Sequence, residues 1–516
     1  MLPHMPLTWM HQVERHAHTK PSTPAMRFGG LTTSWSELAD RTTRLGHALS
    51  ELGVGSGDRV LVLLKNRPEF IETVIAVNRI GAIAVPVNFR LAADEVEYII
   101  RDSGGNVIVT EGGLIDVTDA ACAGIPLPPI KIVCSHPEQM ALPLVSYDEL
   151  LATTPAVEHP WPLRLEDIAL IMYTSGTTGN PKGAMLSYEN LLAGTIAVSQ
   201  IYQLTDEDTI SLITSPLFHI AGVGAALPSL ILGHTSVIVP TGAFDVEAFL
   251  DTLEQEAVTT AFLVPTQWQS VCSSTTLSSR DIQLKVACWG AAPATPALLH
   301  RMNDCFPGVS IVSGFGQTEM SPNTVVLRGQ DAVRKLGSVG KPLPHVMVRV
   351  VDAEMNDVPA GQVGEIVYRG PSTMAGYWNK PDATEEAFHG GWFHSGDLVR
   401  VDEDGFIYVV DRLKDMIISG GENIYCAEVE NVIAGHPQVQ DVALVAKKHD
   451  HWGETPVAVI LAANPEDPPS AADIIEYCQE RLASYKKPTA VLIVEELPRN
   501  ASGKILKSRL RQMINA

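Results

Sequence analysis

The sequence predicts an α/β protein with a large N-terminal domain and a smaller C-terminal domain. Its 516 residues exceed what one hydrophobic core normally serves. Apolar strand-like runs alternate with amphipathic helical stretches, a pattern typical of parallel sheets with crossover helices. After Gly337 the strand-like segments become short and are separated by Gly, Pro and Asp. We therefore expect residues 1–411 to form two α/β sheet layers plus a small β-barrel-like part, and residues 412–516 to form a small α+β domain.

The alternation begins with a helix over Trp35–Gly53, in which Leu38, Leu45 and Leu49 fall on one stripe and Gly53 provides a C-cap. The apolar run that follows predicts a buried strand at Arg59–Lys65. The next expected elements are helix Glu69–Val77, strand Ala82–Val87, helix Ala93–Asp102, strand Asn106–Thr110 and strand Ile168–Met172.

The same alternation resumes after residue 185. Its expected elements are strands Ile210–Thr214, Ser236–Val239, Thr260–Val264 and Lys285–Cys288, with helix Asp245–Glu256 among them. The β-rich part contains the strand-like segments Val346–Val351, Glu365–Arg369 and Gly405–Val410. In the C-terminal domain we expect helix Ala427–Ala434, strands Asp441–Ala446 and Pro456–Leu461, helix Ala471–Ala483 and strand Ala490–Val494.

Charge and cysteine content exclude several classes of protein. The net charge of −22 argues against a nucleic-acid partner, which needs a basic surface, and against tight docking on anionic lipid. The seven cysteines are scattered without a CxxC pair, so we interpret them as free thiols of a reducing compartment. No uninterrupted apolar stretch reaches the ~18 residues of a membrane-spanning helix. We expect a cytoplasmic protein, and leave peripheral membrane contact and a homodimer open.

The first chemical motif is the segment Tyr173–Gly183, which reads YTSGTTGNPKG. Glycines let backbone N–H groups curl around phosphate oxygens, and the hydroxyls and an ammonium add further donors. It is not a Walker loop, because Pro181 separates Asn180 from Lys182. The segment therefore predicts a phosphate-binding loop of another kind.

This loop closely resembles the signature of the adenylate-forming superfamily, which includes acyl-CoA synthetases, firefly luciferase and the adenylation domains of peptide synthetases. In that superfamily the loop holds the β- and γ-phosphates of ATP. The resemblance assigns this role to Thr174, Ser175, Gly176, Thr177, Thr178 and Lys182.

A second match lies at Gly314, Phe315, Gly316, Gln317, Thr318 and Glu319. It resembles the family motif in which an aromatic ring packs on adenine, the Thr contacts the α-phosphate and the Glu holds Mg²⁺. Phe315 replaces the usual Tyr, which keeps the ring and loses a hydroxyl. The turn at Gly290, Ala291 and Ala292 resembles the one that runs along the adenine and acyl pockets. Trp289 before it either shapes the acid site or is a core residue.

Three further matches lie towards the C-terminus. Asp397 and Arg412 match the contacts to the ribose hydroxyls, and Val409 is counted with them among the cofactor-binding residues. Gly420, Gly421 and Glu422 resemble the loop that lines the pantetheine tunnel, with Cys426 where the family usually has Pro. Lys504 resembles the adenylation lysine. The resemblance also implies that the C-terminal domain is mobile and turns about Lys414 between two half-reactions.

The segment Pro216–Gly222 resembles the acyl-CoA synthetase form of another family motif and places His219 at the acid pocket. The small residues Ala221, Gly222, Gly224, Ala225 and Ala226 leave room for a bulky acyl group or serve a helix contact. The resemblance, which is closest to medium- and long-chain fatty acyl-CoA synthetases, implies an ATP-dependent acid–CoA ligase that acts on a fatty acid and uses ATP, Mg²⁺ and coenzyme A. Its catalytic residues would be Lys504, Thr318, Glu319, Lys182 and His219. The alternatives are an aromatic or other non-fatty acid, or a carrier-protein thiol in place of CoA.

Overall fold

The structure is a computed structural model that describes residues 7–134, 144–157, 162–174, 180–204, 208–290, 292, 294–449, 451–499 and 505–515. The chain divides into two compact units. The first unit comprises Met1–Val348 and Tyr368–Phe393, and the second comprises Arg349–Val367 and His394–Ala516. The sequence-based boundary between residues 411 and 412 stays a prediction. Among the described residues, no helix is both long enough and apolar enough to cross a membrane.

The first unit contains a nine-stranded sheet with the strand order β16-β15-β14-β13-β12-β10-β11-β1-β2. Its strands are β1 (Pro24–Phe28), β2 (Leu31–Ser34), β10 (Ile210–Ile213), β11 (Thr235–Ile238), β12 (Thr260–Leu263), β13 (Val286–Gly290), β14 (Ser310–Gly316), β15 (Asn323–Leu327) and β16 (Lys341–Pro342). The inner strands are parallel, and β2, β15 and β16 add antiparallel edges.

An eight-stranded sheet completes the layers of the first unit, in the order β19-β9-β8-β4-β3-β5-β6-β7. Its strands are β3 (Arg59–Leu63), β4 (Ile83–Pro86), β5 (Val107–Glu111), β6 (Ile130–Cys134), β7 (Val145–Ser146), β8 (Ile168–Thr174), β9 (Lys182–Ser187) and β19 (Gly376–Tyr377). The two expected α/β layers are therefore confirmed.

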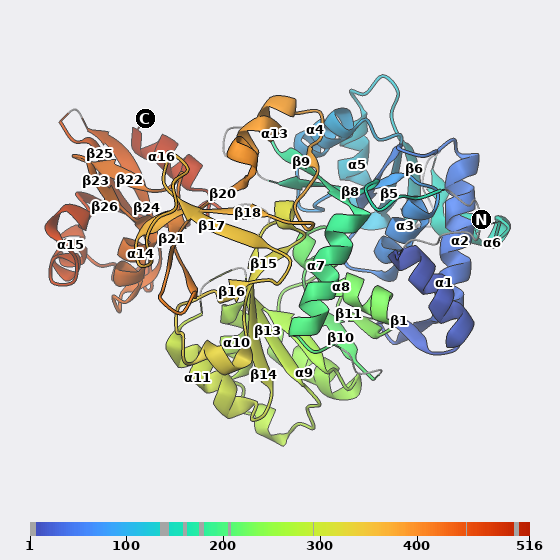
Figure 1. The fold of residues 1–516 in the computed structure, drawn as a ribbon, viewed down its shortest axis with the longest axis horizontal. Coiled ribbons are helices and arrows are strands. Elements are labelled where there is room, and N and C mark those ends of the chain that lie inside the picture. The colour runs from blue at the N-terminus through green and yellow to red at the C-terminus, as the bar shows by residue number, and fades with distance from the viewer. Residues whose placement is uncertain are drawn as a thin grey trace. The chain divides into compact units, whose positions relative to one another are not determined.

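Helices α7 (Tyr188–Ile201) and α8 (Ile220–Leu232) lie between these two sheets (Figure 1). A turn at Ser321 and Pro322 approaches both helices closely. A Cβ atom added at Gly194 of α7 would lie 2.2 Å from the Ser321 carbonyl oxygen, and one at Gly224 of α8 would lie 3.0 Å from the Pro322 ring. Gly224 therefore serves close packing against a turn rather than extra room for an acyl group.

The remaining helices of the first unit cover its two sheets. They are α1 (Trp9–Thr19), α2 (Trp35–Glu51), α3 (Pro68–Arg79), α4 (Ala93–Ser103), α5 (Ile115–Cys122), α6 (Tyr147–Thr153), α9 (Val246–Gln255), α10 (Pro265–Val271), α11 (Pro296–Cys305), α12 (Gly329–Ala332) and α13 (Pro381–Ala387). One core forms where α4 and α5 pack on the eight-stranded sheet, with Val96, Ile99 and Ile100 against Leu61 and Val85.

The second unit contains most of a four-stranded sheet and all of a five-stranded one. The first has the order β17-β18-β20-β21, with β17 (Met347–Val351), β18 (Val363–Arg369), β20 (Phe393–Val401) and β21 (Ile407–Arg412). The expected small β-rich part is confirmed, and because β17 and β21 lie at the two ends of this order, the described strands form an open sheet rather than a closed barrel.

The five-stranded sheet forms the core of the C-terminal part. Its strands are β22 (Ile417–Ser419), β23 (Glu422–Ile424), β24 (Val439–His449), β25 (Gly453–Ala462) and β26 (Ala490–Val494), and its helices are α14 (Cys426–Ala434), α15 (Ala471–Gln479) and α16 (Lys507–Asn515). Ile424, Val429 and Ile433 pack against Leu444 and Ile460 in its core. The expected α+β character is confirmed, although α15 ends four residues before Ala483.

Candidate active site

Thr174 and Lys182 face each other at the base of a hairpin. Thr174 ends β8 and Lys182 begins β9, and they are register partners in the antiparallel pair. The Thr174 hydroxyl is 3.4 Å from the Lys182 carbonyl oxygen. The intervening candidates Ser175, Gly176, Thr177 and Thr178 lie outside the described residues, so their assignment stays a prediction. What the structure does place is one hydroxyl and one ammonium at the two ends of the predicted phosphate loop.

Glu319 joins this pair from the other sheet layer. It lies on the short 3₁₀ turn Thr318–Met320 after β14, and its side chain is largely buried. The Thr174 hydroxyl donates to Glu319 Oε1 over 3.2 Å. We call Thr174, Lys182 and Glu319 the phosphate–metal cluster.

Tyr377 is a member of this neighbourhood that the sequence analysis missed. Its hydroxyl donates to Glu319 Oε1 over 3.0 Å, and the Lys182 ammonium lies 5.1 Å from its ring centroid. Burial and the adjacent carboxylate raise the pKa of Tyr377, so the hydroxyl remains a donor. No local pattern marks a residue whose partner lies 58 positions earlier, and only the pairing of β19 with β9 brings it here.

The cluster suits a cation that is held mainly by its substrate. Within the described ranges, no group of three or more His, Cys, Asp and Glu side chains could hold a metal ion. Mg²⁺ is commonly bound by one or two carboxylates together with phosphate oxygens. Glu319 beside the ends of a phosphate loop fits that requirement, and the role of Thr318 in contacting the α-phosphate stays a prediction.

Two glycines lie side by side on β13 and β14, where Gly290 and Gly314 are register partners. A Cβ atom at Gly290 would lie 3.2 Å from the Phe262 ring, and one at Gly314 would lie 3.0 Å from the Tyr202 hydroxyl and 2.7 Å from the Asn323 side-chain oxygen. The bare backbone is therefore bordered by two aromatic side chains and one carboxamide.

Trp289 and Phe315, the sequence neighbours of Gly290 and Gly314, lie on the other face of the sheet. Successive side chains of a strand point to opposite faces, so Trp289 and Phe315 face away from Gly290 and Gly314. Trp289 is buried, which favours its interpretation as a core residue over a direct role beside Gly290. Gly316 ends β14, Gln317 directly follows it, and Ala292 lies in the bend after β13. Ala291 lies outside the described residues, and the roles of these residues in binding adenine stay predictions.

His219 is the N-cap of α8. Its Nδ1 accepts a hydrogen bond from the Ala221 backbone N–H over 3.2 Å, which leaves Nε2 as the protonated nitrogen of the neutral ring. The ring is accessible to solvent, yet the protein around it disfavours the charged form and lowers the pKa of His219. A neutral ring with an N–H at Nε2 suits a donor to a carboxylic acid. Gly222 contributes no room there, because a Cβ atom on it would lie 2.3 Å from the Pro216 carbonyl oxygen.

Asp397 and Arg412 form a pair within the second unit. They are register partners on β20 and β21, and Arg412 Nε lies 2.7 Å from Asp397 Oδ1. The Ser395 hydroxyl accepts from the Asp397 N–H over 3.0 Å and so steadies the turn. Asp397 is buried, while Val409, earlier on β21, leaves 39% of its surface exposed. The structure brings the two predicted ribose-binding residues together.

Gly420 and Gly421 form the two-residue turn of the hairpin between β22 and β23. Their φ angles are +60° and +88°, and a turn with two such residues favours glycine at both. Glu422 begins β23 opposite Ser419.

Cys426 stands at the position where the resemblance led us to expect Pro, and two hydrogen bonds fix it. Its N–H donates to the Asp411 carboxylate, and its thiol donates to the Asp415 carbonyl oxygen over 2.9 Å. Proline could make neither bond, because it has no N–H and no thiol. The two hydrogen bonds of Cys426 therefore restrain the backbone where a proline ring would otherwise do so.

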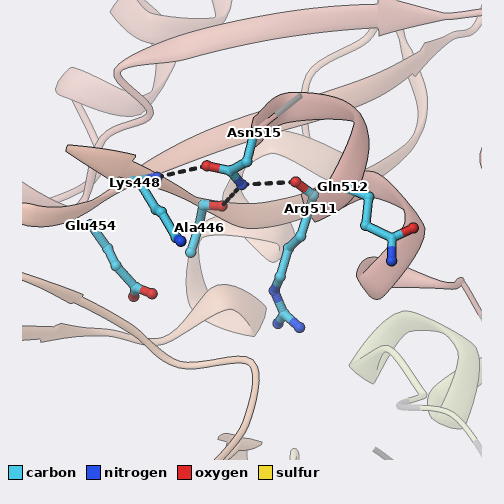
Figure 2. A pocket seen from close by; sticks show the side chains of 6 residues that line it. All are labelled: Ala446, Lys448, Glu454, Arg511, Gln512 and Asn515. Atoms are coloured by element: carbon cyan, nitrogen blue, oxygen red, sulfur yellow. Dashed lines mark hydrogen bonds between the residues drawn. The ribbon is translucent and has the colours of Figure 1, made fainter. Parts of the chain in front are cut away.

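Two further features belong to the second unit, the predicted catalytic residue Lys504 and a surface hollow. Lys504 lies outside the described residues, so its catalytic role stays a prediction. A shallow hollow of about 440 Å³ lies between α16 and the strands β24 and β25, lined by Ala446, Lys448, Glu454, Arg511, Gln512 and Asn515 (Figure 2). The Asn515 side chain bonds to backbone atoms of Lys448, Ala446 and Arg511. Of the predicted site residues whose position the structure describes, none lines this hollow.

Two family models match most of the chain. The family model described as AMP-binding enzyme matches residues 13–378, and the model described as AMP-binding enzyme C-terminal domain matches residues 428–504.

Relatives and solved structures match the chain over nearly its full length. A feruloyl-CoA synthase of Amycolatopsis sp is 39% identical over 96% of this chain and 97% of its own. An indoleacetate–CoA ligase of Aromatoleum aromaticum is 35% identical over 97% of both chains. A long-chain-fatty-acid–CoA ligase of Mycobacterium tuberculosis is 34% identical over 97% of this chain and 95% of its own.

The structure of o-succinylbenzoate CoA synthetase from Bacillus subtilis with its acyl-adenylate intermediate matches with a TM-score of 0.86, at 31% identity over 98% of both chains. The same enzyme in complex with ATP and magnesium ion matches with a TM-score of 0.84, at 31% identity over 98% of this chain and 99% of the other.

Proposed function

Because the chain belongs to the AMP-binding enzyme family, we propose that it activates an aromatic carboxylic acid and transfers the acyl group to coenzyme A. The reaction class is not itself in question: the chain is an AMP-forming acid–CoA ligase that uses ATP, Mg²⁺ and CoA. The proposal concerns the acid. It replaces the fatty acid, which the sequence analysis favoured, by the alternative that was left open beside it.

The class of acid that the relatives act on carries this proposal. The space beside Gly290 and Gly314 is taken up by the Phe262 ring, the Tyr202 hydroxyl and the Asn323 side chain, so these glycines add no room for a long acyl chain. The small residues of α8 do not enlarge the space for a long chain, because Gly222 and Gly224 are both taken up by close packing. The names of two relatives, which act on feruloyl and indoleacetate groups, support the same class of acid.

The proposed reaction has two steps that balance without a protein nucleophile. In the first, a carboxylate oxygen of the acid attacks the α-phosphorus of ATP, and pyrophosphate leaves. In the second, the CoA thiolate attacks the acyl carbonyl, and AMP leaves. All seven cysteines are unpaired, and none is needed as a carrier of the acyl group.

The described residues supply binding and charge. Lys182 would offset negative charge on the β- and γ-phosphates, and Glu319 would hold Mg²⁺, which neutralises phosphate charge when bound. Asp397, which is paired with Arg412, would accept both ribose hydroxyls. His219 would donate from Nε2 to the acid. The turn at Gly420 and Gly421 would admit the pantetheine arm in the second step. Lys504, which lies outside the described residues, would stabilise charge in the first.

A panel of acids tests the proposal. Pyrophosphate release with ATP and Mg²⁺ should be fastest with hydroxycinnamic, indolyl and benzoic acids, and slower with medium- and long-chain fatty acids. Mass spectrometry should find the matching aromatic acyl-CoA. A higher kcat/KM for fatty acids would overturn the choice of acid while leaving the ligase class intact. Replacing CoA by a phosphopantetheinyl carrier protein tests the remaining alternative, and we expect AMP release only with CoA.

A further inference from the structure

Asp102 connects three segments that carry the phosphate–metal cluster. It lies in the last turn of α4, and only 9% of its side chain is exposed. A carboxylate there faces the negative end of the helix dipole and is disfavoured. None of the chemical motifs includes this residue, so any role near the cluster must follow from its contacts.

Two of these contacts reach the carboxylate directly. The Tyr173 hydroxyl donates to Asp102 Oδ2 over 2.8 Å, and Tyr173 directly precedes Thr174. The Lys380 ammonium donates to Asp102 Oδ1 over 2.8 Å. Burial and the Asp102 carboxylate raise the pKa of Tyr173, so its hydroxyl stays protonated and keeps donating. These donors offset the unfavourable position of the carboxylate.

A third contact reaches the far end of the predicted phosphate loop. Tyr98 lies one helical turn before Asp102, and its hydroxyl lies 3.4 Å from Asp102 Oδ1 and 3.1 Å from the Pro181 carbonyl oxygen. Pro181 directly precedes Lys182. Asp102 and its neighbour Tyr98 therefore hold both Tyr173 and Pro181, the residues next to two members of the cluster.

The third member of the cluster is reached through Trp378. Its indole N–H donates to the Asp102 carbonyl oxygen over 3.1 Å, and its backbone N–H donates to the Gly183 carbonyl oxygen over 2.7 Å. Trp378 directly follows Tyr377, whose hydroxyl donates to Glu319. This bond uses the backbone of Asp102 and does not depend on its side chain, but the Asp102 carboxylate reaches the same segment through Lys380, three residues after Tyr377.

We propose that Asp102 is a positioning residue for ATP, which holds Thr174, Lys182 and Glu319 in register without touching the nucleotide. The inference rests on the proposed function. Since the β- and γ-phosphates take part in the first half-reaction alone, loss of Asp102 should affect adenylation and spare thioester formation. A residue that only stabilises the fold would instead lower both half-reactions together, through the fraction of active enzyme.

The test is Asp102→Asn in the full chain, which keeps the size of the side chain and removes its charge. We expect the KM for MgATP to rise about tenfold, as for the loss of a charge-assisted hydrogen bond. The KM for the acid, and thioester formation from synthetic acyl-adenylate and CoA, should stay within about twofold of wild type, since neither step uses these phosphates. Tyr173→Phe removes one donor and should give a smaller shift in the same direction, which keeps the test valid if Asp102→Asn folds poorly.

Glu72→Gln provides the matched control. Glu72 is another buried carboxylate of the first unit. Its side chain accepts hydrogen bonds from Arg41 and Tyr147, and neither of these residues is next to a member of the cluster. We expect it to lower the melting temperature without changing the KM for MgATP. An unchanged KM for MgATP in Asp102→Asn, or an equal loss in both half-reactions, would overturn the inference. Absence of pyrophosphate release from wild type with every acid would instead overturn the proposed function.

Discussion

The Thr174 hydroxyl donates to the Glu319 carboxylate over 3.2 Å, although 145 positions separate the two residues in the chain. Thr174 ends a strand of the eight-stranded sheet, whereas Glu319 follows a strand of the nine-stranded sheet. One hydrogen bond thus joins the two layers at the predicted ATP site. Its geometry depends on how the layers pack, and this makes both residues sensitive positions for substitution.

Glu319→Gln should reduce pyrophosphate release and overall turnover by about 10²–10³-fold, because the proposed Mg²⁺ contact loses its charge. Raising the Mg²⁺ concentration should recover part of the loss. Glu385→Gln, an exposed carboxylate on α13 of the same unit, serves as the control and should behave as wild type. Wild-type rates with unchanged Mg²⁺ dependence in Glu319→Gln would show that the metal assignment is wrong.

Gly421→Leu should impair thioester formation more than adenylation, with acyl-adenylate accumulating while the CoA product falls. A side chain here would enter the proposed pantetheine path, and it would also strain a backbone with φ of +88°.

Gly405→Leu separates these two effects, because Gly405 lies in another turn of the second unit with φ of +81° and open space around its α-carbon. It should show the strain alone, as a lower melting temperature with both half-reactions intact. Equal losses of the two half-reactions in Gly421→Leu would count against the pantetheine placement.

Lys504→Ala should slow adenylation by about 10²–10³-fold, the usual effect of removing one positioned donor from a charged transition state. Thioester formation from synthetic acyl-adenylate and CoA should continue near its normal rate. Lys487→Ala, in the same unit, is the control and should leave both rates unchanged. If both half-reactions collapse together in Lys504→Ala, the model of two conformations does not apply to this chain.

His16 should make the first unit less stable in mild acid. Its ring is buried against Trp35, and burial lowers the pKa of His16 from 6.5 to about 4. The His16 ring is therefore protonated below about pH 6.5 in the unfolded chain but only below about pH 4 in the folded chain. The free energy of unfolding consequently falls as the pH falls from 6.5 to about 4.

Between pH 7.5 and pH 5.5 the resulting loss should be about 1 kcal/mol. His16→Gln stays neutral at every pH and can still donate to the Ile231 carbonyl oxygen, which accepts from the His16 ring. Thermal melting at the two pH values should show a smaller acid-induced drop for this variant than for wild type. Parallel drops in the two proteins would exclude His16 as the source.

The sequence by itself determined the layered α/β architecture and most element positions. Strands such as Arg59–Leu63 and helices such as Ala93–Ser103 appear where the apolar patterns predicted them. These elements follow from local periodicity, which a residue and its near neighbours establish. The motifs around Thr174, Glu319 and Asp397 could also be recognised in the sequence, because each is a short run of residue types that is characteristic by itself.

Only the tertiary structure decided which side chains support those motifs. Tyr377 and Asp102 carry no local signal, and they reach the cluster through strand pairing and helix packing between distant segments. The face on which Trp289 lies follows from the register of β13 against β14, and the use of Gly224 follows from a turn nearly 100 positions away. Such contacts depend on how separate segments pack, and packing is a property of the whole chain that no short stretch of sequence encodes.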